Sequence, residues 1–409
     1  MLATAWRQRL GPMKKEMRCV ICCDQGAPSE LVRDALTVGR ALVERGHQVA
    51  YIVGDPVGLV DHAGSWSPND LYQAPVCRTV PGLVMKRPNM DGFSDVMATA
   101  GFDDKPTLVA LSTLWHRQLT SLKPDAIIGL YAPILWLVGP AHAPTFALGS
   151  GLMLPPPLGT AFPRLTVDST PLADEAVMLA NANAALLRLG QPSIAALSEV
   201  LERCVSLLYG VPAFDPYLQM RRTVSTGLLG EEPSPLVPPA KPRLAAFLDV
   251  YCPGIETIIL ALAGFDQTPV DICVSGATAS MRLFLEQQPH IKFWKDYATL
   301  LEHAASASVL IHHGVHDVGQ RCVSLGRPQL LIPWTREQEI FNGLVQWMSY
   351  SWVKRPNVAI EEMAGTFRAV LHDPSLVVAA QHHARQLSST NLPDALPAIV
   401  EKIEGMSGK

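Results

Sequence analysis

The chain has 409 residues, of which 48% are hydrophobic and 17% are charged, and its formal net charge is -4. A chain of this length accommodates two or three domains, and the composition is too apolar for a disordered protein. The small net charge argues against a nucleic acid as partner. The eight cysteines lie mostly in apolar runs, which predicts buried thiols in a reducing cytoplasm and excludes a disulfide framework.

The first 17 residues are expected to form a loose tail, because they contain no apolar stretch long enough for a signal peptide. The longest uncharged segment, residues 126–163, is interrupted repeatedly by proline, which a membrane-spanning helix tolerates poorly. No transmembrane helix is therefore expected, although peripheral contact with a membrane stays open. We interpret the segment as buried strands and loops that line a pocket.

The sequence from residue 18 predicts a strand at 19–23, an amphipathic helix and a second strand at 48–53. On the helix the apolar residues recur at helical spacing, and they are Leu31, Ala35, Val38 and Leu42. The residues expected on the outer face are Arg33, Asp34, Thr37, Arg40 and Glu44. A strand, helix and strand in this order predict a parallel pair with a right-handed crossover.

Further along the chain, strands are predicted at residues 125–130 and 145–148, followed by a helix-rich stretch from Asp174 to about Leu208. Between residues 231 and 243 five prolines occur, a density that neither a helix nor a central strand accommodates. We interpret this segment as a linker between two domains.

After the linker the alternation of strands and helices resumes. Strands are predicted at residues 243–250, 270–275, 291–293, 308–312 and 329–332, and helices from about 254, near 297–305 and up to 325. The expected fold is α/β, with two doubly wound Rossmann-like domains facing a cleft. The expected division is a tail at 1–17, a first domain at 18–230, a linker at 231–243 and a second domain at 244–409 that includes the terminal helices.

The most informative segment runs from Val309 to Gln338. It reads as a buried strand that ends at His312, His313 and Gly314, a helix that begins near His316, and a second buried strand. The N-terminus of a helix, presented at the carboxyl end of a strand, attracts phosphate oxygens through its free N–H groups and its dipole. The segment therefore predicts a phosphate site.

This segment resembles the donor-binding segment of glycosyltransferases with the GT-B fold that use nucleoside diphosphate sugars. The resemblance rests on the spacing of His313, Gly326, Pro328, Pro333, Glu337 and Gln338. It extends to residues 40–47, 149–157, 181–186 and 214–217, the last three of which are typical of a bacterial branch of these proteins. It covers nearly the whole chain from residue 18.

The resemblance implies an inverting transfer of a sugar from a nucleoside diphosphate, held by the second domain, to a small or lipidic acceptor held by the first. It implies neither a metal ion nor a cofactor, since the helix N-terminus and a histidine would neutralise the leaving diphosphate. The donor-binding residues that it implies are His313, Gly314, His316, Asp317, Arg321, Glu337, Gln338 and Asn342. Glu337 and Gln338 would contact sugar hydroxyls, with assistance from Asn342.

The chain departs from this family at several positions. A second glycine and a phosphate-facing Ser or Thr are replaced by Val315 and Val318, and a ribose-binding Glu is replaced by Arg321. Because a guanidinium accepts no hydrogen bond, Arg321 forms either an ion pair with Asp317 four residues earlier or a contact to phosphate.

The general base of the family is also absent. Its Gly-His pair at the start of the first helix is replaced by Glu30 and Leu31. Glu30 is therefore the first candidate for the catalytic base, and His142, in the uncharged segment, is the second.

Other interpretations stay open. A zinc site at His312, His313 and His316 is disfavoured, because His312 alternates away on the strand and no acidic residue or cysteine has ligand spacing. A degenerate transferase would bind a nucleotide sugar or a partner without turnover. A nucleotide-sugar epimerase of the same architecture fits the proline-spaced segment less well. The sequence names neither the donor sugar and base nor the acceptor.

Overall fold

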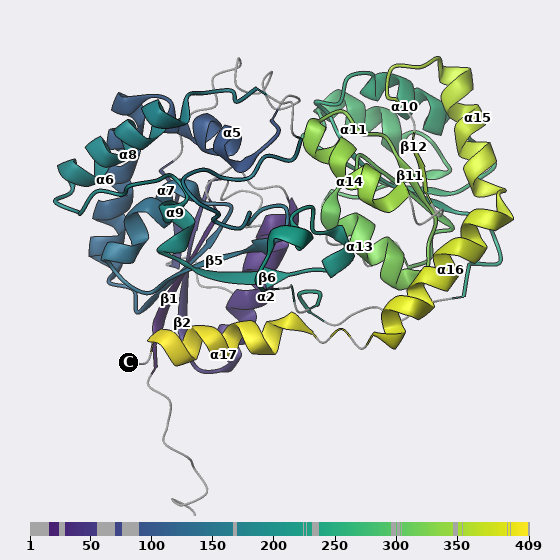
Figure 1. Cartoon of the computed structure of the whole chain (residues 1–409). Helices are drawn as coiled ribbons and strands as arrows, with labels where there is room; N and C mark the ends of the chain where they lie inside the picture. Colours follow the sequence, from purple (N-terminus) through teal and green to yellow (C-terminus); the bar gives the residue numbers. More distant parts are fainter. Residues whose placement is uncertain are drawn as a thin grey trace, which may run out of the picture.

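The computed structural model places two α/β halves side by side (Figure 1). It describes residues 16–23, 29–54, 70–75, 90–166, 170–223, 225, 227–230, 237–295, 300, 303, 305–346, 351–353, 355–390, 392 and 394–407. At residues 29, 30 and 351–353 the description covers the main chain only. The predicted tail lies almost entirely outside the described residues, as do residues 231–236 of the predicted linker.

The first half is built on a six-stranded sheet in the order β3-β2-β1-β4-β5-β6, in which every pair is parallel. The strands are β1 (Arg18–Cys23), β2 (Gln48–Val53), β3 (Leu71–Gln73), β4 (Ala126–Leu130), β5 (Thr145–Ser150) and β6 (Val205–Tyr209). Buried apolar runs form the central strands, as expected for a parallel sheet covered on both faces. The order is that of a doubly wound fold.

Helices cover both faces of this sheet. They are α2 (Ser29–Glu44), α5 (Phe93–Met97), η3 (Ala98–Phe102), α6 (Lys105–Leu122), α7 (Pro133–Val138), η4 (Gly139–Ala141), α8 (Glu175–Arg188) and α9 (Glu199–Glu202). Two short helices follow β6, η5 (Pro212–Phe214) and η6 (Leu218–Met220), and Phe214 of η5 packs with Phe341 of the second half. The predicted apolar face of α2 is confirmed, since Leu31, Ala35, Val38 and Leu42 are all buried. The predicted helix-rich stretch is wrong at its end, because residues 205–209 form the edge strand β6 beside β5.

The second half repeats the topology with a parallel sheet in the order β12-β11-β10-β7-β8-β9. Its strands are β7 (Leu244–Asp249), β8 (Val270–Ser275), β9 (Ile291–Phe293), β10 (Val309–His312), β11 (Gln329–Leu331) and β12 (Ser351–Val353). Its helices are α10 (Ile255–Ala263), α11 (Ala279–Glu286), α13 (His316–Leu325), α14 (Arg336–Gln346), α15 (Ile360–Leu371) and α16 (Pro374–Ser389). The expectation of two doubly wound halves is confirmed.

The last helix departs from the predicted division. Helix α17 (Ala395–Ser407) packs against the first half, although the sequence assigns it to the second (Figure 1). Its residues Ile399 and Ile403 join the core around β1 and α2. The Glu404 carboxylate lies 3.1 Å from Nε2 of His47, and both side chains are buried. A buried apolar face and a buried polar pair together fix α17 on the first sheet.

None of the helices in the described part of the chain combines the length and the apolar character needed to cross a membrane.

Candidate functional site

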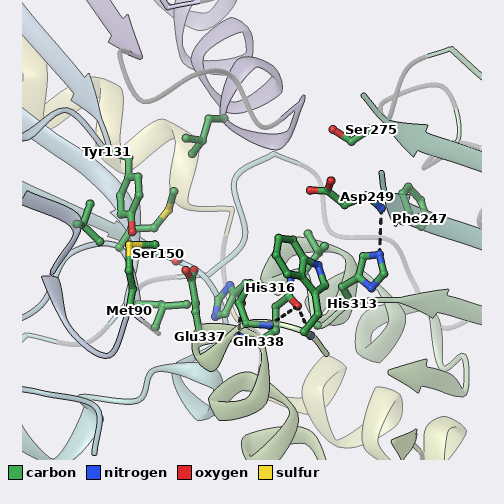
Figure 2. A pocket seen from close by; sticks show the side chains of 18 of the residues that line it. Met90, Tyr131, Ser150, Phe247, Asp249, Ser275, His313, His316, Glu337 and Gln338 are labelled. Atoms are coloured by element: carbon green, nitrogen blue, oxygen red, sulfur yellow. Dashed lines mark hydrogen bonds between the residues drawn. The ribbon is translucent and has the colours of Figure 1, made fainter. Parts of the chain in front are cut away.

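A pocket of about 280 Å³ lies between the two halves at the carboxyl ends of the strands (Figure 2). Ser150, Asp249 and Ser275, which line it, are the last residues of β5, β7 and β8. Ligands of doubly wound folds bind at this edge, because the helices that follow the strands there point their N-termini toward it. The predicted phosphate segment reaches the same pocket through His313, Gly314 and His316.

The two walls of the pocket differ in chemistry. The first half contributes mainly apolar side chains, among them Leu31, Met90, Val96, Tyr131, Leu152 and Met153. The second half contributes most of the polar ones, among them Asp249, Ser275, His313, His316, Glu337 and Gln338. An apolar wall facing a polar wall suits two ligands of different character that meet in one pocket.

Tyr131 stands out on the apolar wall. It follows β4 directly, and its φ of 52° lies in the left-handed region that a bulky side chain rarely adopts. Its ring packs edge-on against Phe93, with 6.2 Å between the ring centroids. Unusual main-chain conformations persist where the surroundings hold them, often at functional sites. The sequence pattern gave no indication of Tyr131.

The His313 side chain lies in the pocket, but the main chain uses both of its ring nitrogens (Figure 2). Nδ1 donates to the Ile332 carbonyl at 2.7 Å, and Nε2 accepts from the Asp249 N–H at 2.9 Å. Burial lowers the pKa of His313, which keeps the ring neutral. In this arrangement the ring ties β7 to the end of β11 and has no hydrogen to donate to a phosphate, unlike the direct contact expected from the sequence.

The neighbouring His312 points away from the pocket and caps the turn. Its Nδ1 accepts from the N–H groups of Gly314 and Val315, and its Nε2 donates to the Gln329 side chain at 2.7 Å. Complete burial lowers the pKa of His312 to about 3. The predicted alternation of His312 and His313 along the strand is confirmed.

The free energy of unfolding should therefore fall in acid. The unfolded chain protonates His312 near its ordinary pKa of about 6.5, whereas the folded chain resists protonation down to a pKa of about 3. His312 thus stabilises the protein above pH 6.5, and we expect a loss of about 2 kcal/mol from this residue between pH 6.5 and pH 5. Urea unfolding at both pH values measures the loss, and His312→Asn should lack that share of it. An equal loss in the variant would contradict this assignment.

Gly314 shapes the turn between β10 and α13. Its φ of 97° favours glycine, and a Cβ there would lie 2.6 Å from Oδ1 of Asn342. Asn342 is only 3% exposed, and neither its oxygen nor its nitrogen has a hydrogen-bond partner among the described residues. Buried amides are nearly always paired. The unpaired Asn342 amide beside Gly314 is therefore a reason to expect a ligand at this turn.

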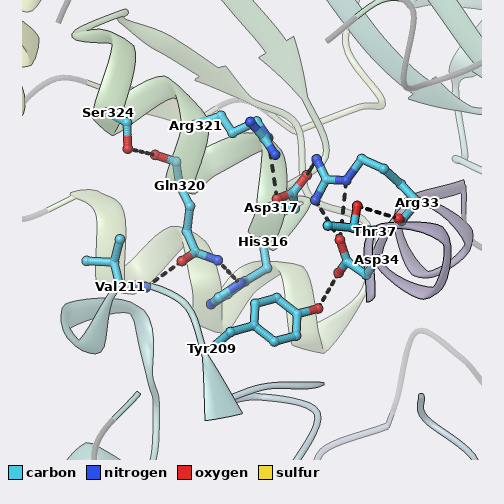
Figure 3. A network of polar contacts seen from close by, with 10 residues as sticks. All are labelled: Arg33, Asp34, Thr37, Tyr209, Val211, His316, Asp317, Gln320, Arg321 and Ser324. Atoms are coloured by element: carbon cyan, nitrogen blue, oxygen red, sulfur yellow. Dashed lines mark hydrogen bonds and ion pairs between the residues drawn. The ribbon is translucent and has the colours of Figure 1, made fainter. Parts of the chain in front are cut away.

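The first turn of α13 connects the two halves (Figure 3). Nε2 of His316 donates to the Phe214 carbonyl at 3.1 Å, and its Nδ1 accepts from Gln320 at 2.7 Å. Burial lowers the pKa of His316, so this ring is also neutral. Asp317 lies 2.8 Å from the Arg33 guanidinium on α2 and 3.7 Å from Nε of Arg321. The ion pair expected as one alternative for Arg321 is therefore present.

Glu337 and Gln338 lie in the first turn of α14 and line the pocket. The Gln338 N–H donates to Oγ1 of Thr335 at 3.3 Å, while Oε1 of Gln338 accepts from the Thr335 N–H at 3.2 Å. This reciprocal pair is a capping box, which satisfies N–H groups at the helix start. It leaves Nε2 of Gln338 without a partner among the described residues, as a donor for a ligand.

The two candidate bases lie at different places relative to the pocket. The Glu30 side chain lies outside the described residues, although α2 begins at Ser29 and the adjacent Leu31 lines the pocket. His142 precedes β5, so it lies at the amino-terminal edge of the sheet, opposite the pocket. Its Nε2 lies 3.0 Å from Nδ1 of His116. The structure thus places His142 away from this pocket. The sequence did not indicate this, because an apolar run does not reveal which end of a strand faces the cleft.

The three histidines of the disfavoured zinc site do not converge on one point. Within the described ranges, no three side chains of His, Cys, Asp or Glu gather as metal ligands. His312, His313 and His316 each bond to separate partners. The absence of a metal requirement stays a prediction.

No protein-family model and no curated protein sequence matches the chain. It is similar to solved glycosyltransferase structures. The glycotransferase of kitacinnamycin has a TM-score of 0.64 and 15% identity, over 96% of this chain and 99% of that one. VinC in complex with DTDP has a TM-score of 0.59 and 15% identity, over 95% of this chain and 100% of that one. The spinosyn rhamnosyltransferase SpnG, complexed with spinosyn aglycone, has a TM-score of 0.60 and 14% identity, over 94% of this chain and 99% of that one.

At sequence identities this low, the structural similarity establishes the fold that the chains share. The structure has two parallel sheets, a pocket at the carboxyl ends of their strands and a last helix that returns to the first half. With the solved structures, these features show that the chain has the GT-B fold of those glycosyltransferases.

Proposed function

We propose that this protein is an inverting glycosyltransferase, which moves a sugar from a nucleoside diphosphate to a hydroxyl group of an apolar acceptor. The second half would hold the donor, and the first half the acceptor. The observation that carries the proposal is that one pocket has a polar wall with the start of α13 and an apolar wall from the first half. The reaction would need neither a metal ion nor a cofactor.

The donor side of the proposal rests on three features of one corner. The first N–H groups of α13 have no partner within the helix, and the helix dipole favours an anion there. Gly314 lets the Asn342 amide pack closely against this turn, and that buried amide lacks a partner among the described residues. Nε2 of Gln338 adds a donor suited to a sugar hydroxyl. Such a corner would stabilise a leaving diphosphate without a metal.

The acceptor side rests on the apolar wall. Tyr131 offers a flat ring, and the flexible thioethers of Met90 and Met153 adapt to irregular apolar shapes. SpnG was solved with an aglycone and VinC with DTDP, and both have this fold. We extend those two ligand classes to this chain: a nucleoside diphosphate and a ring-containing apolar alcohol.

The test has two stages. Uridine and thymidine diphosphates are first screened for an increase in melting temperature; a ligand at 100 times its Kd stabilises the native state by about 2.7 kcal/mol. Nucleotide sugars are then incubated with a panel of apolar alcohols and phenols, with and without EDTA. We expect an EDTA-insensitive product of inverted anomeric configuration by NMR. If the protein binds the diphosphate but transfers sugar to none of the acceptors, the result would contradict the transferase proposal. It would favour a protein that binds a nucleotide sugar without turnover.

A further inference from the structure

The described lining of the pocket carries negative charge but no positive charge to bind a diphosphate. Among its described lining residues there is no Lys or Arg, whereas Asp249 and Glu337 both contribute carboxylates. The neutral rings of His313 and His316 add no positive charge. A diphosphate carries at least two negative charges, so its binding calls for a cation from just outside this lining.

Arg33 lies at the required place (Figure 3). It extends from α2 of the first half to the first turn of α13 in the second, where NH1 lies 2.8 Å from Oδ2 of Asp317. Its side chain is 16% exposed. The residue before Asp317, His316, lines the pocket. A group that sits on the first N–H groups of α13 is therefore a close neighbour of this guanidinium.

The first half fixes the position of Arg33. Nε and NH2 of the guanidinium donate to Oδ1 of Asp34 at 3.2 and 2.8 Å. Asp34 is 2% exposed, and the Tyr209 hydroxyl at the end of β6 donates to its other oxygen. One side of the guanidinium is thus anchored within the first half, while NH1 is directed at whatever acidic group occupies the start of α13.

Arg321 is the other cation beside Asp317, but it is placed less well. It follows Asp317 by four residues on the same helix, about one turn further from the helix N-terminus, and its Nε is 3.7 Å from the Asp317 carboxylate. It belongs to the same half as the proposed donor site, so it does not link the halves. Of the two arginines beside Asp317 in the described part of the chain, Arg33 is the one that combines reach toward the helix start with an anchor in the opposite half.

We propose that Arg33 is the contact of the first half to the phosphates of the donor, and that Asp317 holds its place when the donor is absent. This inference rests on the proposed function. A diphosphate outcompetes a single carboxylate for a guanidinium, because it presents more charge and several oxygens to the planar donor group. Bound donor then joins α13 to α2 through its phosphates, in place of the direct ion pair between Asp317 and Arg33.

The experiment compares each nucleoside diphosphate with its own nucleoside, by calorimetry at low salt. Uridine and thymidine diphosphates are used with wild type, Arg33→Gln, Arg33→Lys and the control Arg40→Gln on the same helix. We expect Arg33→Gln to weaken diphosphate binding about tenfold or more and to leave nucleoside binding unchanged. Arg33→Lys should restore part of the loss, and Arg40→Gln should bind as wild type does. Equal weakening for diphosphate and nucleoside, or none for either, would overturn the inference.

A second pair of variants separates contact from mere folding. If Asp317 competes with phosphate for Arg33, Asp317→Asn should tighten diphosphate binding more in the wild-type background than in Arg33→Gln. Equal tightening in both backgrounds contradicts the exchange. Urea unfolding confirms that each variant is folded. If wild type binds neither diphosphate, the proposed donor site itself fails, which is a different outcome from a normal wild type with an unaffected Arg33→Gln.

Discussion

Replacing Gly314 by alanine is expected to destabilise the protein and to abolish binding of a nucleoside diphosphate. The φ of 97° is unfavourable for any residue with a Cβ, and such strain costs about 1–3 kcal/mol. The added methyl group would also lie 2.6 Å from Oδ1 of Asn342 and 3.0 Å from the Gln338 carbonyl. The turn must shift to relieve these contacts, and the start of α13 shifts with it. Urea unfolding and calorimetry measure the two effects.

Gly343 provides a matched control in the same neighbourhood. It follows Asn342 inside α14, and a Cβ there would meet no atom within 4 Å. Because glycine weakens a helix interior, Gly343→Ala should stabilise the protein by about 0.5–1 kcal/mol and leave ligand binding unchanged. Similar destabilisation by both substitutions would show that the turn geometry of Gly314 is not the cause.

Most of the sheet architecture could be predicted from the sequence. The predicted strands at residues 48–53, 270–275 and 291–293 agree with β2, β8 and β9 at both ends. The turn residues Gly46, before β2, and Gly276, after β8, limit two of them in the sequence. The short strand β3 and the 18-residue helix α6 were not predicted. β3 has only three residues, too few for a periodic pattern. On α6, apolar residues such as the exposed Leu114 lie outside the buried face and obscure the periodicity of the sequence.

The candidate site shows where sequence periodicity stops being informative. The pattern of α2 identifies its apolar face correctly, but it also predicts that Arg33 and Asp34 face solvent. The structure buries Asp34 at 2% exposure and places Arg33 against α13. The periodicity of the sequence shows only which face of the helix is polar. Whether that polar face is buried depends on the second half, more than 250 residues along the chain. An adjacent Arg-Asp pair on a helix was the only trace in the sequence.

A hydroxyl acceptor needs a group to take its proton, and the described pocket narrows the choice. His313 and His316 have both nitrogens occupied. Asp249 and Glu337 are carboxylates of the second half. On the acceptor side, α2 begins at Ser29, and its first turn reaches the pocket at Leu31. Residue 30 therefore lies in the main-chain turn that borders the acceptor wall, which keeps Glu30 as the proposed base.

Glu30→Gln should lower kcat by about 10² to 10⁴, the usual contribution of a general base, and leave the Kd of the nucleoside diphosphate unchanged. The matched variant Glu337→Gln should instead raise the KM for the donor sugar. A carboxylate in the first turn of a helix is held in its charged form by the dipole and takes a proton less readily than imidazole does. Leu31→His, which places an imidazole at a residue that lines the pocket, should therefore raise the rate. If Glu30→Gln keeps the wild-type kcat and Glu337→Gln lowers kcat sharply, Glu30 is not the base and Glu337 takes that role.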